Sequence, residues 1–196
     1  VLLLQLPMLA VFYAARRFYP GHYAGQLNNA ELTVGVAFRQ AVSLFLMCLP
    51  LIWIASLIWT HLLTALEAAG AIDAFEPQAL ITLFQDGGDP IAISLLVALA
   101  ILLAPIVEEI VFRGCVYRFL KSQTTLLPAQ ILSGCVFSFM HWNLMSFVPL
   151  VIVGVFLARV YEKSGNLMVA IWFHAFFNAF SLLMLFITGL SEAIPQ

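Results

Sequence analysis

Long apolar runs constrain this chain more than any other feature. A helix needs about 20 mostly apolar residues to cross the hydrocarbon core of a bilayer. Runs that approach this length lie near residues 1–15, 40–66, 91–120, 124–143, 146–162 and 166–190. The 196 residues are 63% hydrophobic and 9% charged, whereas soluble domains are about 45–50% apolar. None of these runs alternates with the period of two that membrane β-barrels require. We therefore expect an all-α fold, a polytopic transmembrane bundle of about six helices.

The charged residues predict how this bundle is oriented. Its basic residues are Arg16, Arg17, Arg39, Arg113, Arg118, Lys121, Arg159 and Lys163, and all flank the expected spans on one side. The segment 67–90, on the other side, has five acidic residues and no Lys or Arg. By the positive-inside rule, segments 16–39, 121–124 and 163–166 should be cytoplasmic and 67–90 should not. The short loops favour a bacterial inner (plasma) membrane.

The ends and the cysteines add two smaller expectations. The chain begins at Val1, and "VLLLQLPMLAVFYAA" resembles the tail of a longer apolar segment, which predicts a fragment of a longer protein. The three cysteines, Cys48, Cys115 and Cys135, lie in or beside apolar runs without CxxC spacing. A disulfide framework or a cysteine-based zinc site is therefore not expected.

Polar side chains inside the apolar runs point to a function. They occur in "APIVEEIVFRG" at 104–114, "FSFMHWN" at 137–143 and "WFHAFFNAF" at 172–180. A charge near the bilayer centre costs roughly 2.5–3.5 kcal/mol on insertion scales. Such groups persist mainly where they are paired or have a task, although a lone His or Asn can also serve only to join helices.

The spacing of these groups predicts their partners. Glu109 and Arg113 stand four residues apart and can form an intrahelical ion pair. His174 and Asn178 share a helical face in the same way. Glu108 has only apolar residues at the corresponding positions and must find its partner on another helix, which we expect to be His141. Estimated depths overlap loosely, which favours one shared pocket opening toward the cytoplasm.

Pro105, one turn before Glu108, is a further local feature. Proline has no backbone N–H, so it should free the carbonyl of Ile101 and bend the helix beside the expected pocket.

These side chains suit hydrolysis of an amide. A carboxylate and an imidazole that share a water can activate it, and a second imidazole with a carboxamide can stabilise an oxyanion. Glu108, His141 and His174 could instead hold zinc and leave a position for water. The chain has no HExxH, so the sequence does not require a metal.

The same residues resemble the motifs of a known family. "EEIVFR" at 108–113, "FSFMH" at 137–141 and "HAFFN" at 174–178 are similar to the EExxxR, FxxxH and HxxxN motifs of the CPBP family, the Abi or CAAX-protease-like intramembrane proteases. The resemblance divides the chain into N-terminal helices with an acidic loop (1–89), a catalytic core (90–190) and a tail (191–196).

The resemblance implies a role for each residue. Glu108 with His141 would activate water, His174 and Asn178 would stabilise the oxyanion, and the ion pair would brace the site. The family includes type II CAAX prenyl endopeptidases and bacterial members linked to bacteriocin processing or self-immunity. Its metal dependence has been disputed; we expect no required cofactor because Asn178 suits an oxyanion donor better than a zinc ligand, with zinc as the alternative.

The resulting hypothesis is an intramembrane endopeptidase. Its partners would be the lipid bilayer and a membrane-associated peptide or protein substrate, without nucleic acid. The alternatives are a non-catalytic immunity or scaffold protein that retains the pocket, and a proton-coupled transporter. Transport is disfavoured because the sequence lacks the two-half symmetry typical of transporters.

Overall fold

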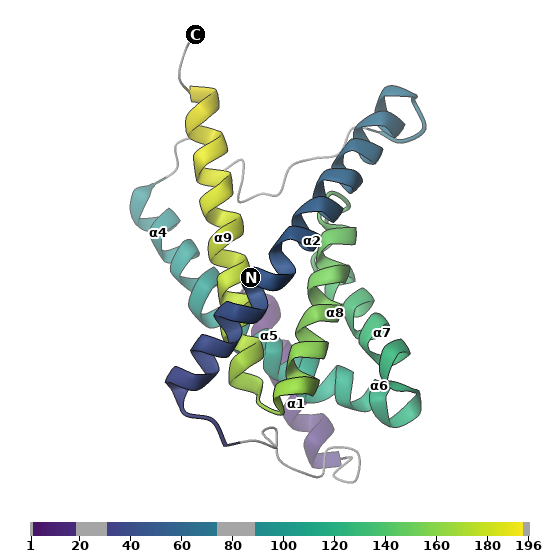
Figure 1. Cartoon of the computed structure of the whole chain (residues 1–196), viewed down its shortest axis with the longest axis vertical. Helices are drawn as coiled ribbons and strands as arrows, with labels where there is room; N and C mark the ends of the chain where they lie inside the picture. The colour runs from purple at the N-terminus through teal and green to yellow at the C-terminus, as the bar shows by residue number, and fades with distance from the viewer. Residues whose placement is uncertain (1, 19–30, 74–88, 194–196) are drawn as a thin grey trace.

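The computed structural model describes residues 2–18, 31–73 and 89–193, and the regular structure in these ranges is entirely helical. Six helices, drawn in Figure 1, form the described part of the chain. They are α1 (Leu2–Phe18), α2 (Val34–Ala68), a compound helix (Pro90–Gln123), α7 (Leu126–Phe139), α8 (Phe147–Ser164) and α9 (Leu167–Ala193). The expected all-α fold of about six helices is confirmed.

Two π-helical turns interrupt the α-helical winding of the compound helix. Its segments are α4 (Pro90–Ala98), the π-helical turn η1 (Leu99–Leu103), α5 (Ala104–Val111), the π-helical turn η2 (Phe112–Tyr117) and α6 (Arg118–Gln123). It begins where the side chain of Asp89 accepts a hydrogen bond from the N–H of Ile91 at 3.1 Å. Pro90 follows at the first helical position, where its missing N–H costs nothing.

The first π-helical turn explains how the helix accommodates Pro105. The N–H of Ala104 donates to the carbonyl of Leu99, five residues earlier. In this register the proline leaves the carbonyl of Ala100 without a backbone donor. The expectation that Pro105 frees the Ile101 carbonyl assumed ordinary α-helical bonding up to the proline, which the π-helical turn over Leu99–Leu103 replaces.

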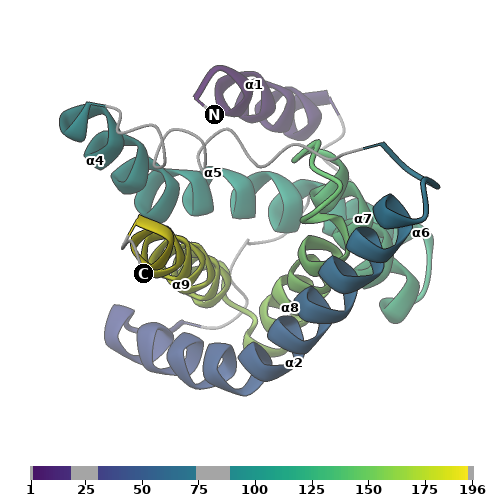
Figure 2. The same cartoon turned by 90° about the horizontal axis from the view of Figure 1, so that it is seen from above.

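The helices pack in layers, which Figure 2 shows from above. The compound helix packs between α1 on its outer side and α9 on its inner side. Helix α2 covers the opposite side of α8 and α9, and α7 packs mainly against α8. The core between α2, α8 and α9 is apolar: the rings of Phe45 and Phe173 lie 5.7 Å apart, and Val153 and Leu157 are fully buried.

The outer surface is apolar as well. Helix α2 exposes a set of large hydrophobic side chains, including Leu46, Met47, Leu51, Trp53, Ile54 and Ile58. Within the described part of the chain, three helical stretches are long and apolar enough to cross a membrane: Val34–Ala68, Pro90–Gln123 and Leu167–Ile187. Helices α1 and α7 are shorter, and α8 has three charged residues near its end. A surface of this kind is suited to lipid, and the chain is an integral membrane protein.

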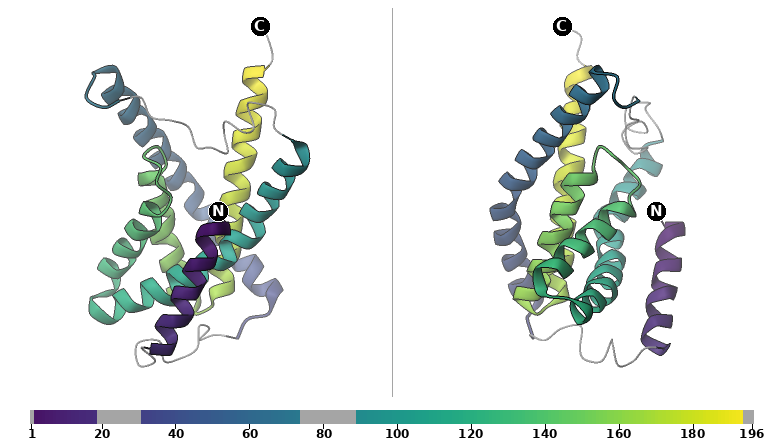
Figure 3. Two further views of the ribbon diagram at one scale, coloured as in Figure 1. Left: turned by 180° about the vertical axis from the view of Figure 1, so that it is seen from behind. Right: turned by 90° about the vertical axis from the view of Figure 1, so that its right-hand side faces the viewer.

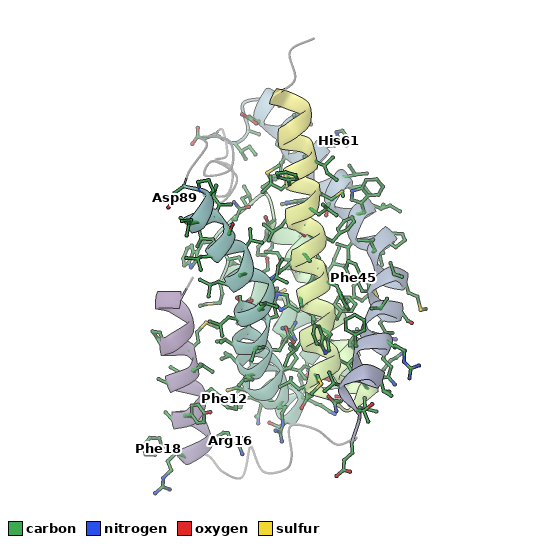
Figure 4. The ribbon with its side chains drawn as sticks, turned by 90° about the vertical axis from the view of Figure 1, so that its left-hand side faces the viewer. Phe12, Arg16, Phe18, Phe45, His61 and Asp89 are labelled. Atoms are coloured by element: carbon green, nitrogen blue, oxygen red, sulfur yellow. The ribbon has the colours of Figure 1, made fainter. Side chains whose placement is uncertain are left out.

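Four of the eight basic side chains lie at one end of the bundle. They stand in the last turns of α1, α6 and α8, and these helix ends lie toward the same end of the bundle in Figures 1 and 3. In Figure 4, Arg16 lies at this end, whereas His61 and Asp89 lie toward the other. Arg113 departs from the expected pattern because it is completely buried. Residues 74–88 of the acidic segment lie outside the described residues.

Candidate active site

Glu109 is the buried centre of a polar cluster between α5, η2 and α9. Its side chain is completely buried, and its Oε1 accepts a hydrogen bond from Nη1 of Arg113 at 2.9 Å. The same oxygen lies 2.9 Å from Nδ1 of His174. The predicted ion pair is present, and the contact with His174 is an addition that helical spacing could not reveal. Glu109 therefore joins a cation and an imidazole through one carboxylate oxygen.

Arg113 is enclosed by three further groups. Its Nη2 donates to the backbone carbonyl of Gly154 on α8 at 2.9 Å. Its Cζ lies 5.0 Å from the ring centre of Phe137 and 5.9 Å from that of Phe112. Ion pairing, a charge-assisted hydrogen bond and cation–π contacts together offset the cost of burying this charge.

Two glycines allow that approach to the Gly154 carbonyl. A Cβ atom added to Gly154 would lie 2.7 Å from the Cα of Gly134 on α7, and one added to Gly134 would lie 2.6 Å from the carbonyl oxygen of Val151. Helices α7 and α8 therefore touch backbone to backbone beside the cluster. Gly134 is thus the partner of Gly154 at this contact.

Glu108 faces two imidazoles that come from other parts of the fold. Its Oε2 lies 3.9 Å from Nε2 of His141 and 3.8 Å from Nε2 of His174. The His141 side chain is 31% exposed, that of Glu108 14% and that of His174 3%. The cluster is therefore accessible at the Glu108–His141 edge and closed around His174. The expected convergence of these three residues is present in the structure.

His141 is held in a turn, not in a helix as expected. Helix α7 ends at Phe139, and Trp142 adopts a left-handed φ of 47°, which breaks the expected run 124–143. Asn143 then stabilises the turn by accepting from the N–H of Ser146 at 2.9 Å. The indole of Trp59 on α2 donates to the carbonyl of Leu144 at 2.9 Å, which ties this turn to the neighbouring helix.

The hydrogen bonds at Nδ1 define the orientation of both imidazoles. Nδ1 of His141 lies 2.8 Å from the carbonyl oxygen of Phe137, which can only accept. Nδ1 of His174 likewise lies against an acceptor, the Glu109 carboxylate. In the neutral state each Nε2 therefore presents a lone pair toward Glu108. Either Nε2 can accept a proton, and either becomes a donor once protonated.

Phe137 packs between these groups and was missed as a site residue. Its ring centre lies 4.7 Å from that of His141 and 5.5 Å from that of His174. The sequence signals for this contact were the i, i+4 spacing of Phe137 and His141 and the FxxxH motif that the two residues match. Phe137 thus fixes the separation of the two imidazoles while it also covers Arg113.

Asn178 binds a different group. Its Nδ2 donates to the backbone carbonyl of Ala100, in η1, at 2.8 Å. It stands one turn beyond His174 on α9, as the spacing predicted, and its amide reaches the carbonyl that Pro105 leaves without a backbone donor. This contact was not expected from the sequence.

The structure also shows how the potential metal ligands are arranged. Among the residues that the structure describes, no three His, Cys, Asp or Glu side chains are grouped closely enough to hold a metal ion. The three cysteines are free.

A helical bundle with an apolar outer surface and a buried carboxylate–imidazole cluster defines a membrane protein with a polar intramembrane site. Residues 90–180 match the family described as type II CAAX prenyl endopeptidase Rce1-like. The chain is 27% identical over 93 residues to "Putative membrane peptidase YdiL" of Bacillus subtilis (strain 168). The aligned stretch covers 47% of this chain and 38% of that relative. No solved structure matches. Residues 90–180 are thus similar to the CAAX-protease-like (CPBP) family.

Proposed function

We propose that this protein is an intramembrane endopeptidase that hydrolyses a peptide bond of a membrane-associated peptide or protein. The observation that carries the proposal is the convergence of the Glu108 carboxylate with Nε2 of His141 and Nε2 of His174. The match of residues 90–180 to that family model supports the same class of activity. The relative's printed name also describes a membrane peptidase.

Glu108 and His141 would activate the hydrolytic water. Their separation of 3.9 Å is too long for a direct hydrogen bond and suits a bridging water. One proton of that water would pass to the pair as its oxygen attacks the substrate carbonyl carbon. When the C–N bond breaks, the same proton would pass to the leaving amine. The partial exposure of His141 supports access for both water and substrate.

His174 and Asn178 would stabilise the oxyanion. His174 can donate from Nε2 only as an imidazolium, because its Nδ1 hydrogen faces Glu109. Asn178 carries two amide hydrogens, and its bond to Ala100 uses one of them. The second would serve the oxyanion.

The mechanism is proposed to need no metal. The chain's own groups suffice to activate water and to stabilise negative charge. In the zinc alternative, Glu108, His141 and His174 would be the ligands, and the ion would supply Lewis-acid activation of water. The site is further proposed to open toward the cytoplasm of a bacterial inner membrane, since the basic helix ends gather at one end of the bundle.

The decisive experiment is cleavage in detergent by purified wild-type protein and by the Glu108→Gln variant. The substrates would be a prenylated CAAX peptide, the same peptide without its lipid, and a single-pass transmembrane peptide. We expect wild-type protein to cleave at least one of them and Glu108→Gln to cleave none at a comparable rate. If neither protein cleaves any peptide, the proposed peptidase function is wrong. If both cleave equally, the proposed role of Glu108 is wrong.

A further inference from the structure

The π-helical turn η1 and the proline after it create a specific structural need. The N–H of Ala104 donates to Leu99, five residues back, so the next bond in this series would join residue 105 to the carbonyl of Ala100. Pro105 has no N–H and cannot make it. A carbonyl in an apolar bundle requires a partner, because little water can reach it there.

The partner comes from a distant part of the chain. Nδ2 of Asn178, on α9, donates to the Ala100 carbonyl at 2.8 Å across a sequence separation of 78 residues. The Asn178 amide thus takes the place of the backbone N–H that proline lacks. Helix α9 packs directly against η1 and α5, and Figure 2 shows α9 beside the compound helix.

This bond joins the two helices that carry the candidate site, about one turn away from the site residues. Asn178 stands one turn beyond His174 on α9, and Pro105 stands one turn before Glu108 on α5. A π-helical turn winds less tightly than an α-helical turn, so relaxation of η1 to α geometry would rotate α5 by roughly a quarter turn. That rotation would move both glutamates away from His174.

We infer that Asn178 is a positioning residue: its amide replaces the hydrogen bond that Pro105 removes, holds η1 in π geometry, and thereby sets Glu108 and Glu109 against His174. The activity test of this inference depends on the proposed peptidase function, whereas its stability test does not. If Asn178 acts instead only on the oxyanion, the Ala100 contact would be incidental.

The two roles are separated by restoring the missing N–H. In Pro105→Ala the backbone can donate to Ala100 without help from Asn178. Turnover and melting temperature are therefore compared in wild type, Asn178→Ala, Pro105→Ala and the double variant. Ser181→Ala is the matched control, because Ser181 lies on the same helix with an exposed side chain.

We expect Asn178→Ala alone to reduce turnover by about tenfold or more, as the loss of one buried hydrogen bond that orients a site would do. In the Pro105→Ala background the same substitution should cause a fold loss at least about threefold smaller, because the Ala100 carbonyl keeps a partner and only the proposed oxyanion contact is lost. An equal fold loss in both backgrounds would show that Asn178 acts on the substrate directly, and would overturn the inference.

Melting of the single variants gives a second test that does not need Pro105→Ala to fold. Without substrate, Asn178→Ala should melt at least about 3 °C below wild type, whereas Ser181→Ala should melt at the wild-type temperature. If Asn178→Ala melts like Ser181→Ala, the amide does not hold η1 and the inference fails. A wild-type protein without peptidase activity would count against the proposed function and leave this test intact.

Discussion

The two adjacent glutamates have opposite surroundings. Glu109 is completely buried between Arg113 and Nδ1 of His174. Glu108 lies at the accessible edge and faces Nε2 of both imidazoles. Neighbouring residues on a helix point about 100° apart, which is why one sequence doublet serves two environments. Substitution to the isosteric Gln should therefore have different effects at the two positions.

For Glu108→Gln we expect turnover to fall by about 10²–10⁴-fold, the usual contribution of a positioned general base. Substrate binding and the melting temperature should stay close to wild type, since the side chain keeps its shape. Replacement of His141 in this background should add little further loss, because residues that activate one water act as a unit. Fully multiplicative losses in a turnover comparison would argue against that shared role.

For Glu109→Gln we expect a loss of stability. The substitution leaves a buried arginine without its counter-charge, which typically costs about 3–5 kcal/mol. For a chain of this size the melting temperature should drop by about 10 °C. Thermal melting in detergent measures the effect, with Glu108→Gln as the matched control. Equal melting temperatures for the two variants would mean that the ion pair does not support the fold.

The same side chains also decide whether the activity depends on a metal. We expect turnover to persist in excess chelator and the purified protein to contain far less than one zinc per chain by elemental analysis. The reason is that the proposed mechanism uses only a carboxylate, two imidazoles and an amide. Activity that disappears on removal of one bound zinc, and returns when zinc is added, would establish the alternative.

At the scale of elements, the contact between α7 and α8 determines where the backbone lies beside Arg113. Gly134 and Gly154 let the two backbones touch, and the Gly154 carbonyl accepts from Arg113. A methyl group at Gly154 would meet the backbone of Gly134, which cannot move aside as a flexible side chain could. The glycine pair therefore links helix packing to the position of Arg113.

Gly154→Ala should destabilise the protein by about 1–3 kcal/mol, the usual cost of overpacking. It should also lower turnover, since Arg113 and Glu109 would shift together. Gly35→Ala on α2 is the matched control, because nothing lies within 4 Å of a Cβ atom there. Melting and turnover of the two variants should differ clearly; equal behaviour would remove the glycine contact as a constraint.

At the scale of the whole molecule, the basic helix ends predict topology. We expect residue 163 to face the cytoplasm and residue 73 to face the other side. The measurement uses single cysteines at these positions, in a background without the three native ones, labelled from each side of intact cells. Cytoplasmic labelling at both positions would contradict the proposed orientation.

The amino-acid sequence was sufficient to predict the helical class, the approximate spans and the members of the cluster. Apolar runs of membrane length leave a chain few alternatives to helices, and the i, i+4 spacing of Glu109 and Arg113 is enough to predict their pair. Local signals of this kind depend on residues that are close in the chain, so they can be recognised before any folding is considered.

Contacts across the bundle depend on tertiary packing and could not be predicted in the same way. Glu109 meets His174 across 65 residues, and Asn178 meets Ala100 across 78. The register of η1 and the left-handed turn at Trp142 arise where α-helical bonding is interrupted. Helix rotation and packing distance set such contacts, and neither can be deduced from spacing along one helix. The sequence therefore determined which groups enter the membrane, and packing decided which of them meet.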